Sequence, residues 1–222
     1  HNAAQAAKVM AIQTAETKSK LLNDMATALR ASKTDIFKAN AIDIEFAITN
    51  GLSESMVDRL QLNDQRIEDM AVGLETVAQL PDVVGTIKDQ DVMPNGLKIS
   101  KMRRPLGVIC MIFEARPNVT ADAAGLCIKS GNAVILRGGK EALNSSLAIA
   151  KVLQDVLASY QLPKEIVTVI ADPDRALMTQ LLTQKKYINL VIRMVKLSAQ
   201  VYVTPSKLYW CTKILLQSFY LW

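Results

Sequence analysis

The sequence has little of what metal sites and disulfide frameworks need. Its 222 residues include three cysteines and a single histidine, His1. A single histidine excludes a metal site built from several histidines. Because the cysteines are few, odd in number and widely spaced, they indicate a reducing compartment rather than a set of disulfides. Cys110 and Cys127 lie within apolar stretches, so we expect both to be small core residues.

Long apolar runs are also missing. No run approaches ~18 residues, the length from which a membrane-spanning helix is considered. The polar, alanine-rich start does not resemble a secretory signal. We therefore expect a cytoplasmic protein without a membrane partner. The chain starts with His1 rather than methionine, which leaves open where the natural N-terminus lies.

Acidic residues are absent from residues 193–222. Four of the 26 basic residues and none of the 21 acidic residues lie there, so the net charge of +5 falls to +1 for residues 1–192. This distribution argues against a nucleic-acid-binding face. The same segment holds six of the eleven aromatic residues and no glycine. We interpret residues 193–222 as an atypical tail left by a reading-frame change, with a divergent natural tail as the alternative.

The centre of the chain has the pattern of a βαβ unit. Leu106 to Phe113 is an apolar run of strand length, and the polar turn Glu114 to Asn118 follows it. Val119 to Ser130 has apolar residues at helical spacing, Ala133 to Leu136 is a second apolar run, and Arg137 to Lys140 forms a second polar turn. Continuous apolar strands of this kind are typical of parallel sheets buried on both faces. Ligands bind at the carboxyl ends of such strands, so the two polar turns are the predicted site.

The flanking regions predict a helical scaffold before this unit and a repeated β-α pattern after it. Residues 3–80 read as helices, with a capping box at Ser32 and Asp35 and an N-cap at Asn63. Residues 97–102 alternate in polarity and predict a half-exposed strand. Further along we predict a helix over 141–160, a strand over 166–170, a helix opened by Asp172 and Pro173, and a strand over 187–192. The whole predicts an α/β fold with a Rossmann-like parallel sheet and helices on both faces.

Both polar turns resemble a known family. EARPNVTADAA, starting at Glu114, and SGNAVILRGGKEA, starting at Ser130, are similar to the gamma-glutamyl phosphate reductases of the aldehyde dehydrogenase superfamily. The resemblance extends over residues 3–192. It implies N-terminal helices and an NADP-binding domain, and the NADPH-dependent reduction of gamma-glutamyl phosphate to glutamate 5-semialdehyde in proline biosynthesis. It implies a small-molecule substrate, no nucleic acid and no membrane, and it leaves a homo-oligomer open.

The resemblance assigns NADP(H) binding to the second turn. Arg137 is the basic residue expected near the adenosine ribose, because a guanidinium suits the extra phosphate of NADP. Gly138 and Gly139 would let the backbone approach the ligand closely. Lys140 and Glu141 are weaker candidates. The alternative is a tight turn with a solvated arginine.

The first turn is expected to line the nicotinamide or acyl pocket. Pro117 fixes the backbone, and Arg116 is a candidate contact for an anion. Asn118 is a candidate oxyanion donor, but capping of the following helix would explain it equally well.

The expected nucleophile is missing. In the family a cysteine thiolate from a glycine-rich loop of a second domain, beyond the position of Ile192, attacks the acyl carbon. No stretch here matches that loop, and we reject Cys110, Cys127 and Cys211 as nucleophiles. We therefore expect a truncated reductase that is inactive alone. The alternative is a non-enzymatic nucleotide-binding module that retains the cofactor domain.

Overall fold

Helices and strands alternate through the second half of the chain, as the apolar pattern predicts. This computed structural model describes residues 1–172, 174–195 and 198–203. The helices are α1 (Asn2–Ala11), α2 (Ala15–Ala31), α3 (Lys33–Thr49), α4 (Glu54–Leu60), α5 (Asp64–Gln79), α6 (Val119–Lys129), α7 (Leu143–Ser159) and α8 (Arg175–Thr183). The strands are β1 (Ile87–Val92), β2 (Lys98–Met102), β3 (Val108–Ile112), β4 (Ala133–Arg137), β5 (Val167–Val169), β6 (Leu190–Val195) and β7 (Ser198–Val203). Short 3-10 turns, η1 (Lys140–Ala142) and η2 (Lys164–Ile166), precede α7 and β5.

The main sheet has the strand order β5-β4-β3-β6-β7. β3 pairs in parallel with both β4 and β6, and β5 pairs in parallel with β4. The predicted parallel sheet is therefore confirmed for these strands. β7 runs antiparallel to β6 and lies in the segment interpreted as a tail, where the sequence pattern predicts no strand. Because the strand order reverses beside β3, the carboxyl end of β3 lies at a topological switch point.

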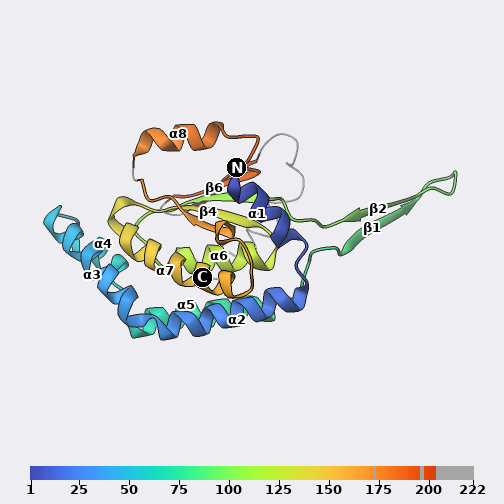
Figure 1. Ribbon diagram of the computed structural model, residues 1–222. Helices are drawn as coiled ribbons and strands as arrows, with labels where there is room; N and C mark the ends of the chain where they lie inside the picture. Colours follow the sequence, from blue (N-terminus) through green and yellow to red (C-terminus); the bar gives the residue numbers. More distant parts are fainter. Residues whose placement is uncertain (173, 196–197, 204–222) are drawn as a thin grey trace.

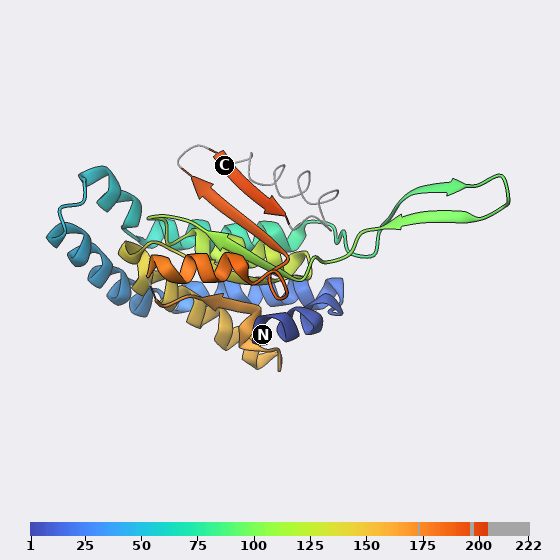
Figure 2. The ribbon, with the colours of Figure 1, turned by 90° about the horizontal axis from the view of Figure 1, so that it is seen from above.

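Helices cover both faces of this sheet. α1 and α8 lie on one side, α6 and α7 lie on the other, and α2 and α5 form a further layer beyond α6 and α7 (Figure 1, Figure 2). Ile109 and Met111 of β3 belong to the core shared with α2, α5, α6 and α7. Val108 and Cys110 belong to the core shared with α1. Burial on both faces explains why the strand reads as a continuous apolar run.

The hairpin of β1 and β2 is the exception to this layered packing. It extends away from the rest of the domain (Figure 2). The predicted strand over residues 97–102 is confirmed as β2, but every residue of β2 is exposed, so the expected burial of one of its faces is wrong. The alternation of polarity is present, but neither face of the hairpin is covered in the described part of the chain. Within that same part, no helix is both long enough and apolar enough to cross a membrane.

The predicted helix starts have mixed outcomes. The cap at Asn63 is confirmed, since its side chain accepts a backbone N–H of the first turn of α5 at 2.8 Å. Ser32 occupies the N-cap of α3 but makes no side-chain cap bond, because the chain passes from α2 into α3 with near-helical backbone there. The predicted cap at Asp172 is wrong: α8 begins at Arg175, and Asp172 accepts the N–H two residues on. Pro173 lies outside the described residues.

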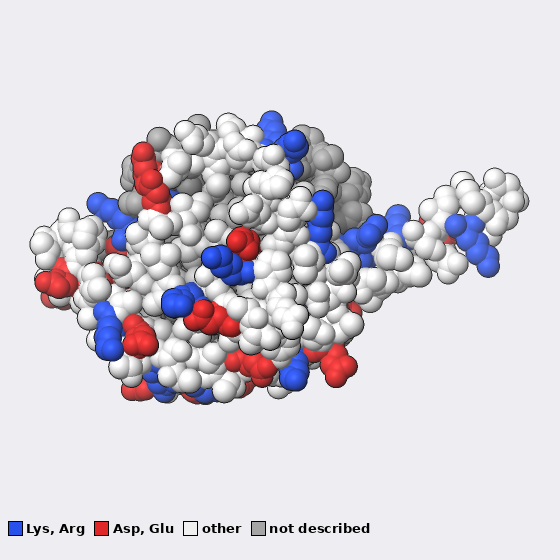
Figure 3. All heavy atoms as spheres, in the orientation of Figure 1, with Lys and Arg blue, Asp and Glu red and all other residues white. Residues whose placement is uncertain are grey.

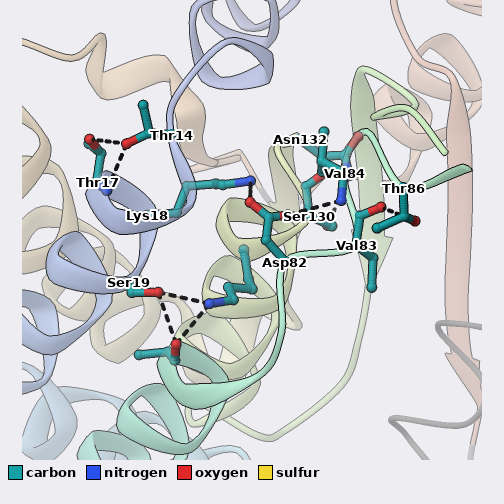
Figure 4. A network of polar contacts seen from close by, with 12 residues as sticks. Thr14, Thr17, Lys18, Ser19, Asp82, Val83, Val84, Thr86, Ser130 and Asn132 are labelled. Carbon is teal, nitrogen blue, oxygen red and sulfur yellow. Dashed lines mark hydrogen bonds and ion pairs between the residues drawn. The ribbon is translucent and has the colours of Figure 1, made fainter. Parts of the chain in front are cut away.

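A buried polar network fixes the segment that leads into the hairpin (Figure 4). Lys18 of α2, only 1% exposed, forms an ion pair with Asp82. Lys129, at the end of α6, donates to Ser19 Oγ at 2.8 Å and to the carbonyl oxygen of Ala78 at 2.7 Å. A cation at the carbonyl end of α5 also complements the helix dipole. The network therefore joins α2, α5 and α6 immediately before the exposed hairpin.

Candidate functional site at the carboxyl edge of the sheet

The two predicted turns lie side by side. Ile112, the last residue of β3, is in register with Arg137, the last residue of β4. The backbone N–H of Phe113 continues the ladder by donating to the carbonyl oxygen of Arg137 at 3.0 Å. One residue pair then connects the turns directly, because the N–H of Ala115 donates to Glu141 Oε1 at 3.0 Å. Strand register and this hydrogen bond bring the two turns together.

The first turn has an unusual backbone. Ala115 is buried and has φ of 37°, in the left-handed region that residues with a Cβ seldom adopt. Arg116 is exposed, Pro117 is buried and Asn118 is half-buried. Asn118 occupies the N-cap of α6 with helical rather than extended backbone, and its side chain makes no cap bond. The capping interpretation is therefore wrong, and the role as oxyanion donor stays a prediction.

A carboxyl group that the sequence analysis missed lies behind this turn. Asn118 Nδ2 donates to Asp122 Oδ2 at 3.4 Å. Burial raises the pKa of Asp122 to about 6, and the hydrogen bond from Asn118 only partly opposes that rise. The signal in the sequence was the only acidic residue of the mainly apolar α6. Asp122 can therefore change its protonation state near neutral pH.

The second turn packs against its own chain. Arg137 is half-buried, and its Nη1 donates to the carbonyl oxygen of Gly138 at 3.1 Å. A Cβ on Gly138 would lie 3.3 Å from the Phe113 ring, and one on Gly139 would lie 2.0 Å from Glu141 Oε1. Packing within the protein therefore favours glycine at both positions. Close approach of a ligand to this backbone stays a prediction.

Cationic side chains gather at this edge. Arg116 is exposed, as is Lys140, whose Nζ lies 5.6 Å from the ring centre of Phe46 in α3. Arg193 of β6 is in register with Ile112, as Arg137 is on the other side, so Arg137 and Arg193 leave the sheet on the same face. The sequence pattern gives no sign that Arg193 belongs to the site, because this residue begins the segment interpreted as a tail. Only the strand register places it here.

The described thiols are not built for catalysis. Cys110 and Cys127 are 0% and 1% exposed, as expected of core residues. Burial raises the pKa of each thiol to about 12, so neither forms the reactive thiolate near neutral pH. Cys211 lies outside the described residues. Within them, no cluster of histidine, cysteine and acidic residues could hold a metal ion.

Comparison with known proteins decides the family. The profile of the aldehyde dehydrogenase family matches residues 1–194. The chain belongs to the aldehyde dehydrogenase family. The match spans the helical scaffold, the hairpin and the parallel sheet, so it includes both turns of the candidate site.

The relatives within this family confirm the resemblance carried by the two turns. A gamma-glutamyl phosphate reductase of Shewanella denitrificans is 57% identical over 191 residues, which are 86% of this chain and 46% of that relative. The solved gamma-glutamyl phosphate reductase of Thermotoga maritima has a TM-score of 0.84 at 39% identity, covering 87% of this chain and 47% of that one. The corresponding Saccharomyces cerevisiae structure has a TM-score of 0.78 at 37% identity, covering 86% and 49%. The chain thus spans about half the length of the curated relatives that it matches.

Proposed function

We propose that residues 1–192 form the N-terminal helices and NADP-binding domain of a gamma-glutamyl phosphate reductase. Such an enzyme reduces gamma-glutamyl phosphate to glutamate 5-semialdehyde in proline biosynthesis, in the cytoplasm. Membership of the aldehyde dehydrogenase family implies a nicotinamide cofactor. The observation that carries the proposal is that two turns similar to that enzyme meet at the carboxyl edge, beside the switch point.

The residues of this edge fit an anionic dinucleotide. When bound, the cofactor supplies the hydride. Arg137 would hold the additional phosphate of NADP, and Gly138 and Gly139 would form the backbone beside it. Arg116 and Pro117 would border the nicotinamide end, where Asn118 would donate to a developing oxyanion. Among the described residues on the face drawn in Figure 3, basic and acidic side chains are interspersed, and this mixture supports a small-molecule rather than a nucleic-acid partner.

Titration of the 222-residue chain with NADPH and NADH tests the assignment of Arg137. We expect tighter binding of NADPH, and we expect Arg137→Ala to weaken it by roughly 1.5–3 kcal/mol, the range for a hydrogen bond to a charged group. Binding of NADH should change little. Arg104→Ala is the matched control, because it removes an exposed arginine that precedes β3, at the opposite edge of the sheet. Equal affinity for both nucleotides would refute the role of Arg137.

A non-enzymatic nucleotide-binding module is the second candidate. The observation that favours it is the burial of Cys110 and Cys127, since neither thiol can act as the nucleophile. Turnover can be assayed with glutamate 5-semialdehyde, phosphate and NADP as the formation of NADPH, and both candidates predict none, because the truncated reductase is expected to be inactive alone. We expect the 222-residue chain to bind NADPH without turnover. Phosphate-dependent turnover that Cys211→Ser abolishes would assign the nucleophile to Cys211 and exclude the module.

A further inference from the structure

One carboxylate links the two turns of the candidate site. Glu141 Oε1 accepts the N–H of Ala115 at 3.0 Å. Ala115 is 6% exposed, so without Glu141 this N–H would lose a hydrogen bond in a nearly dry environment. Among the described non-glycine residues, only Ala115 and Gln161 have a positive φ. Such a conformation persists only where its surroundings enforce it.

Gly139 provides independent evidence for the position of this carboxylate. Its φ of −68° and ψ of 157° suit any residue, so the backbone conformation does not require glycine. A Cβ at this position would nevertheless lie 2.0 Å from Oε1, 2.4 Å from Cδ and 2.5 Å from Oε2 of Glu141. All three of the nearest atoms belong to Glu141. The Glu141 carboxylate therefore occupies the space that a side chain at position 139 would need.

We propose that Glu141 is a positioning residue, which holds the nicotinamide-side turn at Ala115 to Asn118 in place beside the Arg137 turn. This inference rests on the proposed function. The neighbouring Lys140 is directed toward Phe46 instead, so it takes no part in the link. Glu141 acts through the Ala115 amide rather than by touching the cofactor.

The first test compares two substitutions of Glu141 in NADPH titrations. Glu141→Ala removes the acceptor and should weaken binding roughly five- to tenfold, the equivalent of one buried hydrogen bond. Glu141→Gln keeps an acceptor oxygen for Ala115 and should stay within about twofold of the unsubstituted chain. Glu16→Ala, which removes an exposed carboxylate of α2, is the control for charge alone. Equal losses for Gln and Ala would indicate a direct contact through charge, and no loss for Ala would leave only a structural role. Either result overturns the proposal.

The second test uses Gly139→Ala in two backgrounds. In the otherwise unsubstituted chain the new Cβ must displace the Glu141 carboxylate, so the loss should match that of Glu141→Ala. In the Glu141→Ala background the close contacts are gone, so the same change should cost clearly less affinity than in the unsubstituted chain. A glycine needed only for ligand approach would cause the same loss in both backgrounds, and such additive losses would overturn the proposal.

Hydrogen exchange separates this inference from the proposed function. If the unsubstituted chain binds neither NADPH nor NADH, the proposed function fails, and the link can still be examined directly. Amide exchange of residues 113–118 should accelerate in Glu141→Ala and remain slow in Glu141→Gln. Unchanged protection in Glu141→Ala would show that the carboxylate does not hold the turn.

Discussion

The two edges of the main sheet are constructed differently. At the amino edge, Asn132 is 4% exposed and its Oδ1 accepts the N–H groups of Leu106 and Gly107 at 2.7 and 2.9 Å. Asn189 accepts the N–H of Val108 there at 2.8 Å. The ion-paired network of Figure 4 lies at the same edge. At the carboxyl edge, cationic side chains are exposed or half-buried instead. The comparison indicates that buried polar contacts hold the amino edge together, whereas the proposed ligand site lies at the carboxyl edge, where the cationic side chains are more exposed.

Breaking the amino edge should have the largest effect on stability. Asp82→Ala leaves the ammonium of Lys18 buried without its carboxylate, which should lower the free energy of unfolding by about 3–5 kcal/mol. Asp155→Ala, which breaks the exposed pair with Lys151, should cost under about 0.5 kcal/mol. Urea denaturation measures both. Lys18→Met should recover much of the loss in the Asp82→Ala background, and a similar small effect of Asp82→Ala and Asp155→Ala would contradict this view of the amino edge.

The next largest effect on the free energy of unfolding should come at alkaline pH, from the two thiols buried in the apolar core between the edges. A free thiol in the unfolded chain ionises near pH 9, whereas burial raises the pKa of Cys110 and Cys127 to about 12. The folded state therefore keeps protons that the unfolded state loses, so stability is full below pH 9 and falls as the pH rises toward 12. Two such thiols should cost roughly 2–3 kcal/mol between pH 8 and 10, at about 1.4 kcal/mol per pH unit each. Denaturation of the double variant Cys110→Ala and Cys127→Ala should show a drop smaller by this amount.

The sequence predicts the helices and strands of the fold better than it predicts the contacts within the candidate site. The βαβ unit and its two turns are predictable because apolar runs, glycines and polar turn residues act locally. The exposure of the hairpin is not, since alternating polarity cannot reveal that neither face is covered. The placement of Arg193 beside the site depends on strand register, and the link from Glu141 to Ala115 depends on a left-handed backbone. Both arise only when segments distant in sequence are packed together.

At the carboxyl edge, the charged form of Asp122 should lower the free energy of unfolding at neutral pH. The pKa of Asp122 is raised to about 6, from an ordinary value of 3.8, so the folded state holds its proton more tightly. The associated stability is present below pH 3.8 and is lost as the pH rises through 6. Asp122→Asn removes the buried charge and should stabilise the chain by about 1–3 kcal/mol at pH 7. The gain should vanish near pH 4, and urea denaturation at both values measures it. A gain that is independent of pH would show that charge is not the cause.

The smallest expected effect on stability concerns two asparagines, one in the helical scaffold and one at the candidate site. Asn63 and Asn118 both stand at the N-cap of a helix, but only Asn63 accepts a backbone N–H. Asn63→Ala should therefore cost about 1 kcal/mol, as loss of a helix cap usually does. Asn118 makes only a long hydrogen bond to Asp122, so Asn118→Ala should cost under about 0.5 kcal/mol near pH 7. Thermal unfolding of the two variants under the same conditions provides the measurement. Equal losses would mean that Asn118 supports its helix as Asn63 does, and the carboxyl edge would then resemble the scaffold at this position. A negligible loss for Asn118 would instead leave its amide available for the proposed oxyanion contact.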